Sequence, residues 1–173
     1  MRLFATMALL LPVLFHAAWA QSPQAATAGG WQCWADAAAR YNVPVDLLYA
    51  IARVETGSRY NLVSPTNKNG SYDIGLMQIN SIHLPRLAKF GITKKDLLEK
   101  PCVNLHVGAW LLSDAIARHG YTWVAIGAYN AGSHNKRKIY ARKVFAMYNK
   151  IVRERRVALA DAGVDTPTKE ASN

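Results

Sequence analysis

The sequence predicts a mainly α-helical domain of the α+β type: a helical bundle with a cleft and, near residues 61–74, a short β-hairpin. Three observations predict it. Apolar residues recur at helical spacing over much of the chain, helix start and stop signals separate these segments, and the stretch 57–73 is rich in Gly, Ser, Asn and Pro instead. With 173 residues, 51% of them hydrophobic, the chain is long enough for one compact domain.

The helices follow from local signals. An alanine-rich segment, 31–42, predicts the first helix. Pro44 fits the first position of a second helix that runs to about Glu55, and Gly57 stops it. A short helix is predicted over 82–90, and another begins at the capping-box pair Thr93 and Asp96 and ends just before Pro101. The longest helix is predicted over 103–119, with Gly120 after it, and a basic helix over 135–155.

Between the second helix and these later ones lies the polar stretch. Its dipeptide Asn69-Gly70 is a hairpin-type turn signal, which favours a short two-stranded element here. A helical pattern is expected to resume around Leu76.

The N-terminus resembles a cleaved export signal. Arg2 precedes the short apolar run 7–15, and Ala18-Trp19-Ala20 has the small-residue pattern of a cleavage site. An uncleaved anchor is the alternative, but the run is short for a membrane span and no later stretch is long and apolar enough. We therefore expect a periplasmic protein with no stable membrane anchor. The predicted layout is a signal peptide over 1–20, a flexible lead-in over 21–30, one domain over 31–157 and a disordered tail over 158–173.

The sequence contains two cysteines, Cys33 and Cys102. In an exported chain they predict one disulfide, with two buried free thiols as the alternative. His83, His106, His119 and His134 lack the spacing of a metal site, so no metal and no cofactor is expected.

The chain is strongly basic, with 21 Lys and Arg against 11 Asp and Glu. This balance favours an anionic partner. Export argues against nucleic acid, so anionic cell wall or membrane is the preferred interpretation, and a simply solvated basic face is the alternative.

Glu55 is the most informative residue. At 100° per residue it falls in the middle of the apolar arc formed by Leu48, Ile51 and Ala52. A carboxyl group there points into the core or a cleft, where desolvation raises its pKa toward that of a general acid, unless it escapes to solvent at the helix end. Asp73 follows across the turn-rich stretch, and two carboxyl groups flanking a cleft can cleave a glycosidic bond.

Three motifs carry a family resemblance. Glu55-Thr56-Gly57 resembles a catalytic Glu-Ser motif with Thr in place of Ser, 75–80 (GLMQIN) resembles the G-L-M-Q motif, and 128–132 (AYNAG) resembles the A-Y-N-A-G motif. Residues 31–150 thus resemble the lysozyme-like catalytic domain of soluble lytic transglycosylases, above all the small exported members dedicated to secretion systems, conjugation or type IV pili. Asp73 departs from that family toward the second acid of animal C-type lysozymes.

The resemblance implies peptidoglycan as the substrate, Glu55 as the acid and base, and a 1,6-anhydro product. It implies that Met77, Gln78 and Tyr129 line the substrate cleft and that Asn130 positions the sugar, with Met77 as a core residue the alternative. The Tyr129 hydroxyl is suited to hold a carboxyl group. A component of a secretion, conjugation or pilus apparatus is the implied partner. Two alternatives stay open: a hydrolytic muramidase using Glu55 and Asp73, and a non-catalytic assembly factor that retains the fold.

Overall fold

The computed structural model describes residues 30–130 and 133–163 of the chain. The predicted signal peptide, nearly all of the predicted lead-in, and residues 164–173 of the predicted tail lie outside these residues. The elements are α1 (Gly30–Tyr41), α2 (Val45–Thr56), β1 (Asp73–Ile74), β2 (Ile79–Asn80), the 3-10 helix η2 (Ser81–His83), α3 (Leu84–Ala88), α4 (Lys94–Glu99), α5 (Pro101–His119), α6 (Trp123–Asn130) and α7 (His134–Asp161). The fold is mainly helical, as predicted.

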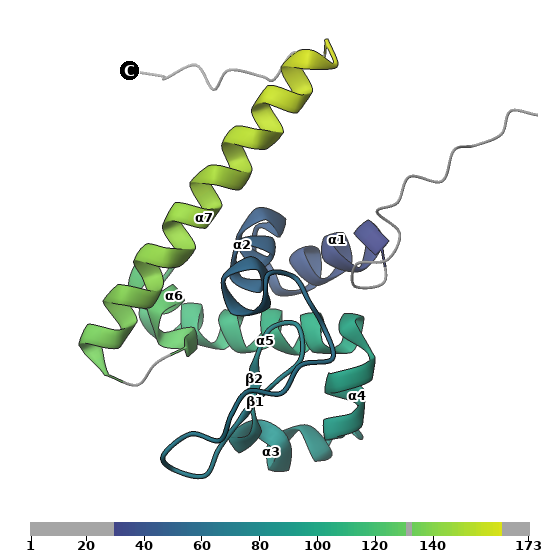
Figure 1. Ribbon diagram of the computed structural model, residues 1–173, viewed down its shortest axis with the longest axis vertical. Coiled ribbons are helices and arrows are strands. Elements are labelled where there is room, and N and C mark those ends of the chain that lie inside the picture. The colour runs from purple at the N-terminus through teal and green to yellow at the C-terminus, as the bar shows by residue number, and fades with distance from the viewer. Residues whose placement is uncertain (1–29, 131–132, 164–173) are drawn as a thin grey trace, which may run out of the picture.

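Helix α5 lies at the centre of the domain (Figure 1). It packs against α1, α4 and α6, while α7 packs against α2 and α6. The core combines fully buried side chains of α2 and α5, such as Leu48, Ile51, Leu105 and Leu112. The predicted disulfide between Cys33 and Cys102 is present and joins α1 to the start of α5.

The small sheet differs in detail from the predicted hairpin. Strand β1 pairs antiparallel with β2, with Asp73 opposite Asn80, and Ile74 also forms an isolated bridge with Val63. The expected helical pattern around Leu76 is wrong, because residues 75–78 form the turn between the two strands. Two left-handed residues close this turn, Gly75 at φ 71° and Gln78 at φ 48°, and they are incompatible with a helix.

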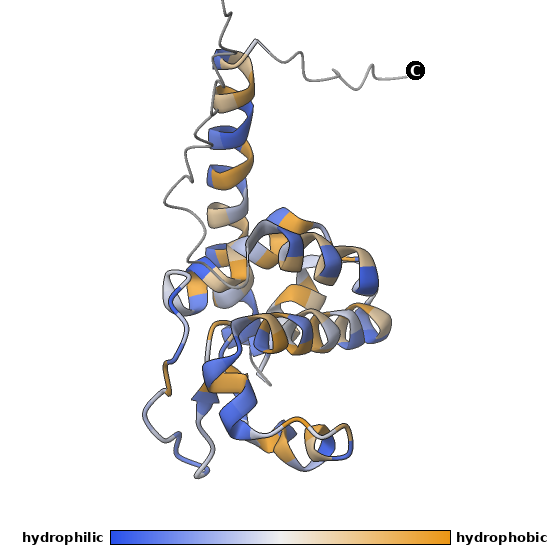
Figure 2. Ribbon diagram, turned by 90° about the vertical axis from the view of Figure 1, so that its right-hand side faces the viewer, coloured by the Kyte–Doolittle hydropathy of each residue, from blue (hydrophilic) through white to orange (hydrophobic). Residues whose placement is uncertain are grey.

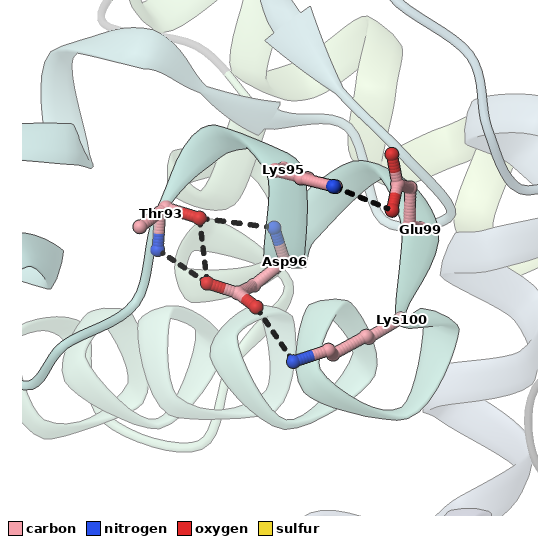
Figure 3. Close-up of polar contacts among 5 residues, drawn as sticks. All are labelled: Thr93, Lys95, Asp96, Glu99 and Lys100. Atoms are coloured by element: carbon pink, nitrogen blue, oxygen red, sulfur yellow. Dashed lines mark hydrogen bonds and ion pairs between the residues drawn. The ribbon is translucent and has the colours of Figure 1, made fainter.

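The capping box of α4 is confirmed and is shown in Figure 3. The Thr93 hydroxyl accepts a hydrogen bond from the Asp96 amide, and the Asp96 carboxylate accepts one from the Thr93 amide. Lys100 and Lys95 add ion pairs to Asp96 and Glu99, respectively. The local signal therefore gave the correct start for this helix.

Helix α7 is longer than expected. It has 28 residues against 19 in α5, so the prediction that 103–119 is the longest helix is wrong. Its apolar stripe of Tyr140, Val144 and Ile151 packs on the core, and the helix continues to Asp161, past the predicted domain end at residue 157. Figure 2 shows hydrophobic and hydrophilic residues alternating along the projecting end of this helix. Arg155 connects the helix to α2 by an ion pair with Asp46.

Within the described residues, no helix combines the length and the hydrophobicity that a bilayer crossing requires.

Candidate active site

Glu55 lies in the last turn of α2 and lines a cleft of about 830 Å³. Asp73, Gln78, Tyr129 and Asn130 line the same cleft. Two other hollows of the described surface, beside Trp123 on α6 and beside Trp110 on α5, are lined by no carboxyl group. Among these three, only the cleft of Glu55 presents a carboxyl group; a further hollow near the end of α7 is lined by Glu154 and Asp161.

The end of α2 presents Glu55 to the cleft. Gly57 adopts φ 65° and its amide closes the helix on the Ala52 and Arg53 carbonyls. The buried Thr56 hydroxyl donates to the Leu76 carbonyl at 3.1 Å, which joins the helix end to the turn between β1 and β2. The residue that departs from the usual Glu-Ser motif thus holds the two walls of the cleft together.

The Glu55 carboxyl group is half-buried and strongly perturbed. Its pKa is raised to about 7, against an ordinary value of 4.5, and the largest cause is burial away from water. The negative charge of Asp73 contributes to the rise, while hydrogen bonds from Tyr140 and Asn130 and the positive charge of Lys143 oppose it. A carboxyl group with a pKa near 7 is poised to give up and take back a proton at neutral pH.

Tyr140 of α7 holds this carboxyl group in place. Its hydroxyl donates a hydrogen bond of 2.6 Å to Glu55 Oε1. Burial raises the pKa of Tyr140 well above 10, and the Glu55 charge adds to the rise, so the hydroxyl stays protonated. The Tyr140 ring stacks on that of Tyr129, 6.5 Å away between centroids.

Asp73 lies on β1, among polar side chains on the sheet side of the cleft. Its carboxylate accepts 2.7 Å from Asn80 Nδ2 and 3.4 Å from the Ser64 hydroxyl, and its amide donates to that same hydroxyl at 2.8 Å. These contacts hold the Asp73 side chain in place, and Asp73 still lines the cleft. The structure thus brings together the two predicted acids.

The turn between β1 and β2 is clamped by Asn104, a fully buried residue of α5. Its side chain accepts from the Met77 amide and donates to the Ile74 and Leu97 carbonyls, each at 2.8 Å. A side chain at Gly75 would come within 2.3 Å of Asn104 Nδ2, so only glycine fits there. The clamp sets the position of Gln78, which lines the cleft and donates to the Gly75 carbonyl.

Two of the expected contacts are corrected by the structure. Met77 does not line the cleft: it is 0% exposed, and its side chain packs against Gly108 of α5, because the turn directs it inward. Tyr129 lines the cleft but donates its hydroxyl to the Met77 carbonyl at 2.8 Å, so the tyrosine that holds a carboxyl group is Tyr140. Residues 131–132 of the third motif lie outside the described residues.

Tyr140 and Asn104 were missed from the sequence, although each carries a signal. Tyr140 opens the apolar stripe of a helix that is otherwise basic, which directs it to the core. Asn104 lies one residue before Leu105 in the apolar helix, and a buried amide needs partners. Cys33, Cys102 and His106 form the one group of possible metal ligands in the described part of the chain, and the disulfide removes two of them.

Comparison with known proteins identifies the family of this chain. The family model for the transglycosylase SLT domain matches residues 32–152. The Invasion protein IagB of Salmonella typhimurium is 46% identical over 123 residues, covering 69% of this chain and 76% of that protein. Protein IpgF of Shigella flexneri is 41% identical over 130 residues, or 73% and 85% of the two chains. A "Peptidoglycan-binding-like protein" of Escherichia coli O157:H7 is 37% identical over 129 residues, or 69% and 77%. This chain therefore belongs to the transglycosylase SLT domain family, whose fold is lysozyme-like.

Proposed function

We propose that this chain is a peptidoglycan lytic transglycosylase that cleaves the MurNAc-β-1,4-GlcNAc bond and leaves a 1,6-anhydro end. The observation that carries the proposal is Glu55, a half-buried carboxyl group on a cleft with its pKa raised to about 7. Each of the three motifs contributes a described residue to this cleft, namely Glu55, Gln78 and Tyr129. The family match supports peptidoglycan as the substrate class.

Glu55 serves as acid and then as base. Its carboxyl group donates a proton to the glycosidic oxygen as the bond from C1 to that oxygen breaks, and positive charge develops at C1 of the muramyl sugar. The resulting carboxylate takes the proton of the C6 hydroxyl of that sugar, and the C6 oxygen closes on C1. Glu55 is protonated again, no water is consumed, and the proton given to the leaving oxygen is replaced by the proton of the C6 hydroxyl.

The neighbours of Glu55 support both steps. Tyr140 donates to Oε1, which holds the carboxyl group in place and stabilises it as a carboxylate after the first transfer. Asp73 contributes a negative charge beside the developing cation and also keeps Glu55 protonated by repulsion.

Asp73 is also the observation that favours a second candidate, a hydrolytic muramidase. A second carboxylate in the same cleft can attack C1 or stabilise the cation until water arrives. The two reactions differ in product, because hydrolysis leaves a reducing end heavier by one water than the anhydro end.

The proposal extends to location and role. The expected export signal and the basic charge fit a protein that acts on the cell wall in the periplasm. One relative is named an invasion protein. We propose that this chain opens the wall locally for an envelope-spanning apparatus, one component of which is its partner.

The test is digestion of purified peptidoglycan followed by mass analysis of the muropeptides. We expect anhydro ends from the wild-type chain and a rate lower by about 10²–10⁴-fold for Glu55→Gln, which keeps the shape but cannot donate the proton. Glu99→Gln, an exposed residue of α4, is the matched control and retains full activity.

Reducing ends alone would establish the hydrolase instead. Full activity of Glu55→Gln would contradict the mechanism. An absence of wall cleavage by the wild-type chain, together with normal apparatus assembly, would establish the non-catalytic assembly factor.

A further inference from the structure

The cleft carries positive charge that cleavage of a neutral glycosidic bond does not require. Lys68 lies on the loop before β1, and Lys136 lies in the first turn of α7. Both line the cleft that contains Glu55, as does Arg137, which has an interaction of its own within the protein. Figure 1 shows these two segments at the same side of the domain, with the start of α7 above the loop.

Neither ammonium group has an ion-pair partner among the described residues. Lys95, Lys100 and Lys150, in contrast, each pair with an acid on their own helix or at its edge. The first turn of α7 also holds no acidic residue, so Lys136 lies at the positive end of the helix dipole, where a cation is unfavourable. Neither ion pairing nor stabilisation of α7 explains why lysines occur at these two positions.

The bond-breaking step does not account for them either. The transition state is cationic, and a nearby ammonium group would oppose it. The charges that act most on Glu55 are those of Asp73 and Lys143. Lys68 and Lys136 are therefore better suited to a part of the substrate away from the reacting atoms.

The backbone holds both lysines in defined positions. The Lys68 loop is braced by hydrogen bonds of Ser71 with Asn67, Asn69 and Asn80. The start of α7 is fixed by close packing on α6, where a side chain at Gly127 would come within 2.6 Å of the Arg137 carbonyl. Ammonium groups carried on braced backbone lose less freedom when they bind an anion.

We propose that Lys68 and Lys136 form a carboxylate-binding subsite for the stem peptide of peptidoglycan. The sugar rings are neutral, whereas the peptide joined to the lactyl group of muramic acid carries free carboxylates. The subsite gives the enzyme a preference for strands with anionic stems. This inference rests on the proposed function, because its ligand is the peptide attached to the glycan that is cleaved.

The test is binding of soluble peptidoglycan fragments to the full chain carrying Glu55→Gln, so that no fragment is cut. Three fragments share one glycan length: stems with free carboxylates, the same stems with every carboxyl group converted to an amide, and strands without stems that carry free lactyl carboxylates. We expect amidation to weaken binding by about threefold to tenfold, an effect that falls at high ionic strength.

The double variant Lys68→Ala/Lys136→Ala is expected to bind free and amidated stems alike. Its matched control, Lys89→Ala/Lys138→Ala, removes the same charge from exposed positions outside the cleft and retains the difference. In the active chain the cleft variant raises KM for anionic stems and leaves kcat unchanged, since the stems lie away from the reacting bond.

Equal binding of free and amidated stems by the parent chain would overturn the subsite, as would loss of the difference in the control variant. If the cleft variant weakened only the strands without stems, the ligand would be the lactyl carboxylate, and the stem assignment would be wrong. If discrimination among fragments persisted while the wild-type chain cut nothing, the subsite would stand and the proposed function would fail.

Discussion

The two walls of the cleft place a carboxyl group in different environments, one desolvated and one polar. On the helical wall, Glu55 is desolvated and has one hydroxyl donor, Tyr140, and its pKa is raised to about 7. On the sheet wall, Asp73 is surrounded by the polar side chains of Ser64 and Asn80, which donate hydrogen bonds to it. Environment, not residue type, separates a proton donor from a fixed negative charge.

The difference arises from secondary structure. Glu55 sits on the apolar face of a helix that packs against α1 and α7, so hydrophobic side chains exclude water around it. Asp73 belongs to a two-residue strand next to a polar loop, which offers hydroxyl and amide groups instead. The helical wall excludes water, and the sheet wall supplies polar groups. Substitutions in the two walls should therefore shift the pKa of Glu55 in opposite directions.

The largest effect in this comparison is expected from Asp73→Asn. Loss of the negative charge removes stabilisation of the cationic transition state, and we expect the cleavage rate to fall by about 10–10²-fold. The charge also raises the pKa of Glu55, so its removal moves the alkaline limb of the pH–rate profile to lower pH. The control is Asp114→Asn, because Asp114 forms an ion pair with Arg86 outside the cleft. An unchanged rate and profile would separate Asp73 from the chemistry.

Tyr140→Phe is expected to lower the rate less than Asp73→Asn and to shift the pH–rate profile in the opposite direction. The hydroxyl stabilises the Glu55 carboxylate, so its loss raises the pKa of Glu55 and moves the alkaline limb to higher pH. Loss of positioning should lower kcat by about threefold to tenfold. Tyr148→Phe on the same helix tests a tyrosine outside the cleft, and a shift of the limb to lower pH in Tyr140→Phe would contradict the assigned hydrogen bond.

The smallest effect concerns the bond that joins the two walls. Thr56→Val leaves the Leu76 carbonyl without the hydroxyl donor, and we expect the free energy of unfolding to fall by about 1–2 kcal/mol. Thr56→Ser keeps the hydroxyl and should stay close to the wild type. Denaturant unfolding of the two variants measures the difference, and a larger loss for Thr56→Ser than for Thr56→Val would show that the methyl group, not the hydroxyl, is what matters.

Much of the helical wall could be predicted from the sequence, because its signals are local. The apolar face of α2 and the Gly57 stop indicated that Glu55 faces inward, and the capping box set the start of α4. The disulfide was also predicted, from export and an even number of cysteines.

The sheet wall could not be predicted in the same way, because the residues that hold it in place are distant in sequence. The turn from Gly75 to Gln78 is held by Asn104, which lies 27 residues beyond Met77, and no local pattern reports such a clamp. For the same reason Met77 was expected in the cleft and is buried, and the Tyr140 contact, which joins residues 85 positions apart, went unnoticed.

The central claim is that Glu55 still holds its proton near neutral pH. A titration of the side-chain carboxyl carbon of Glu55, followed by carbon NMR and assigned with the Glu55→Gln variant, measures this directly. We expect a midpoint at about 7, displaced upward by burial. A midpoint near 4.5, the ordinary value for glutamate, would contradict it.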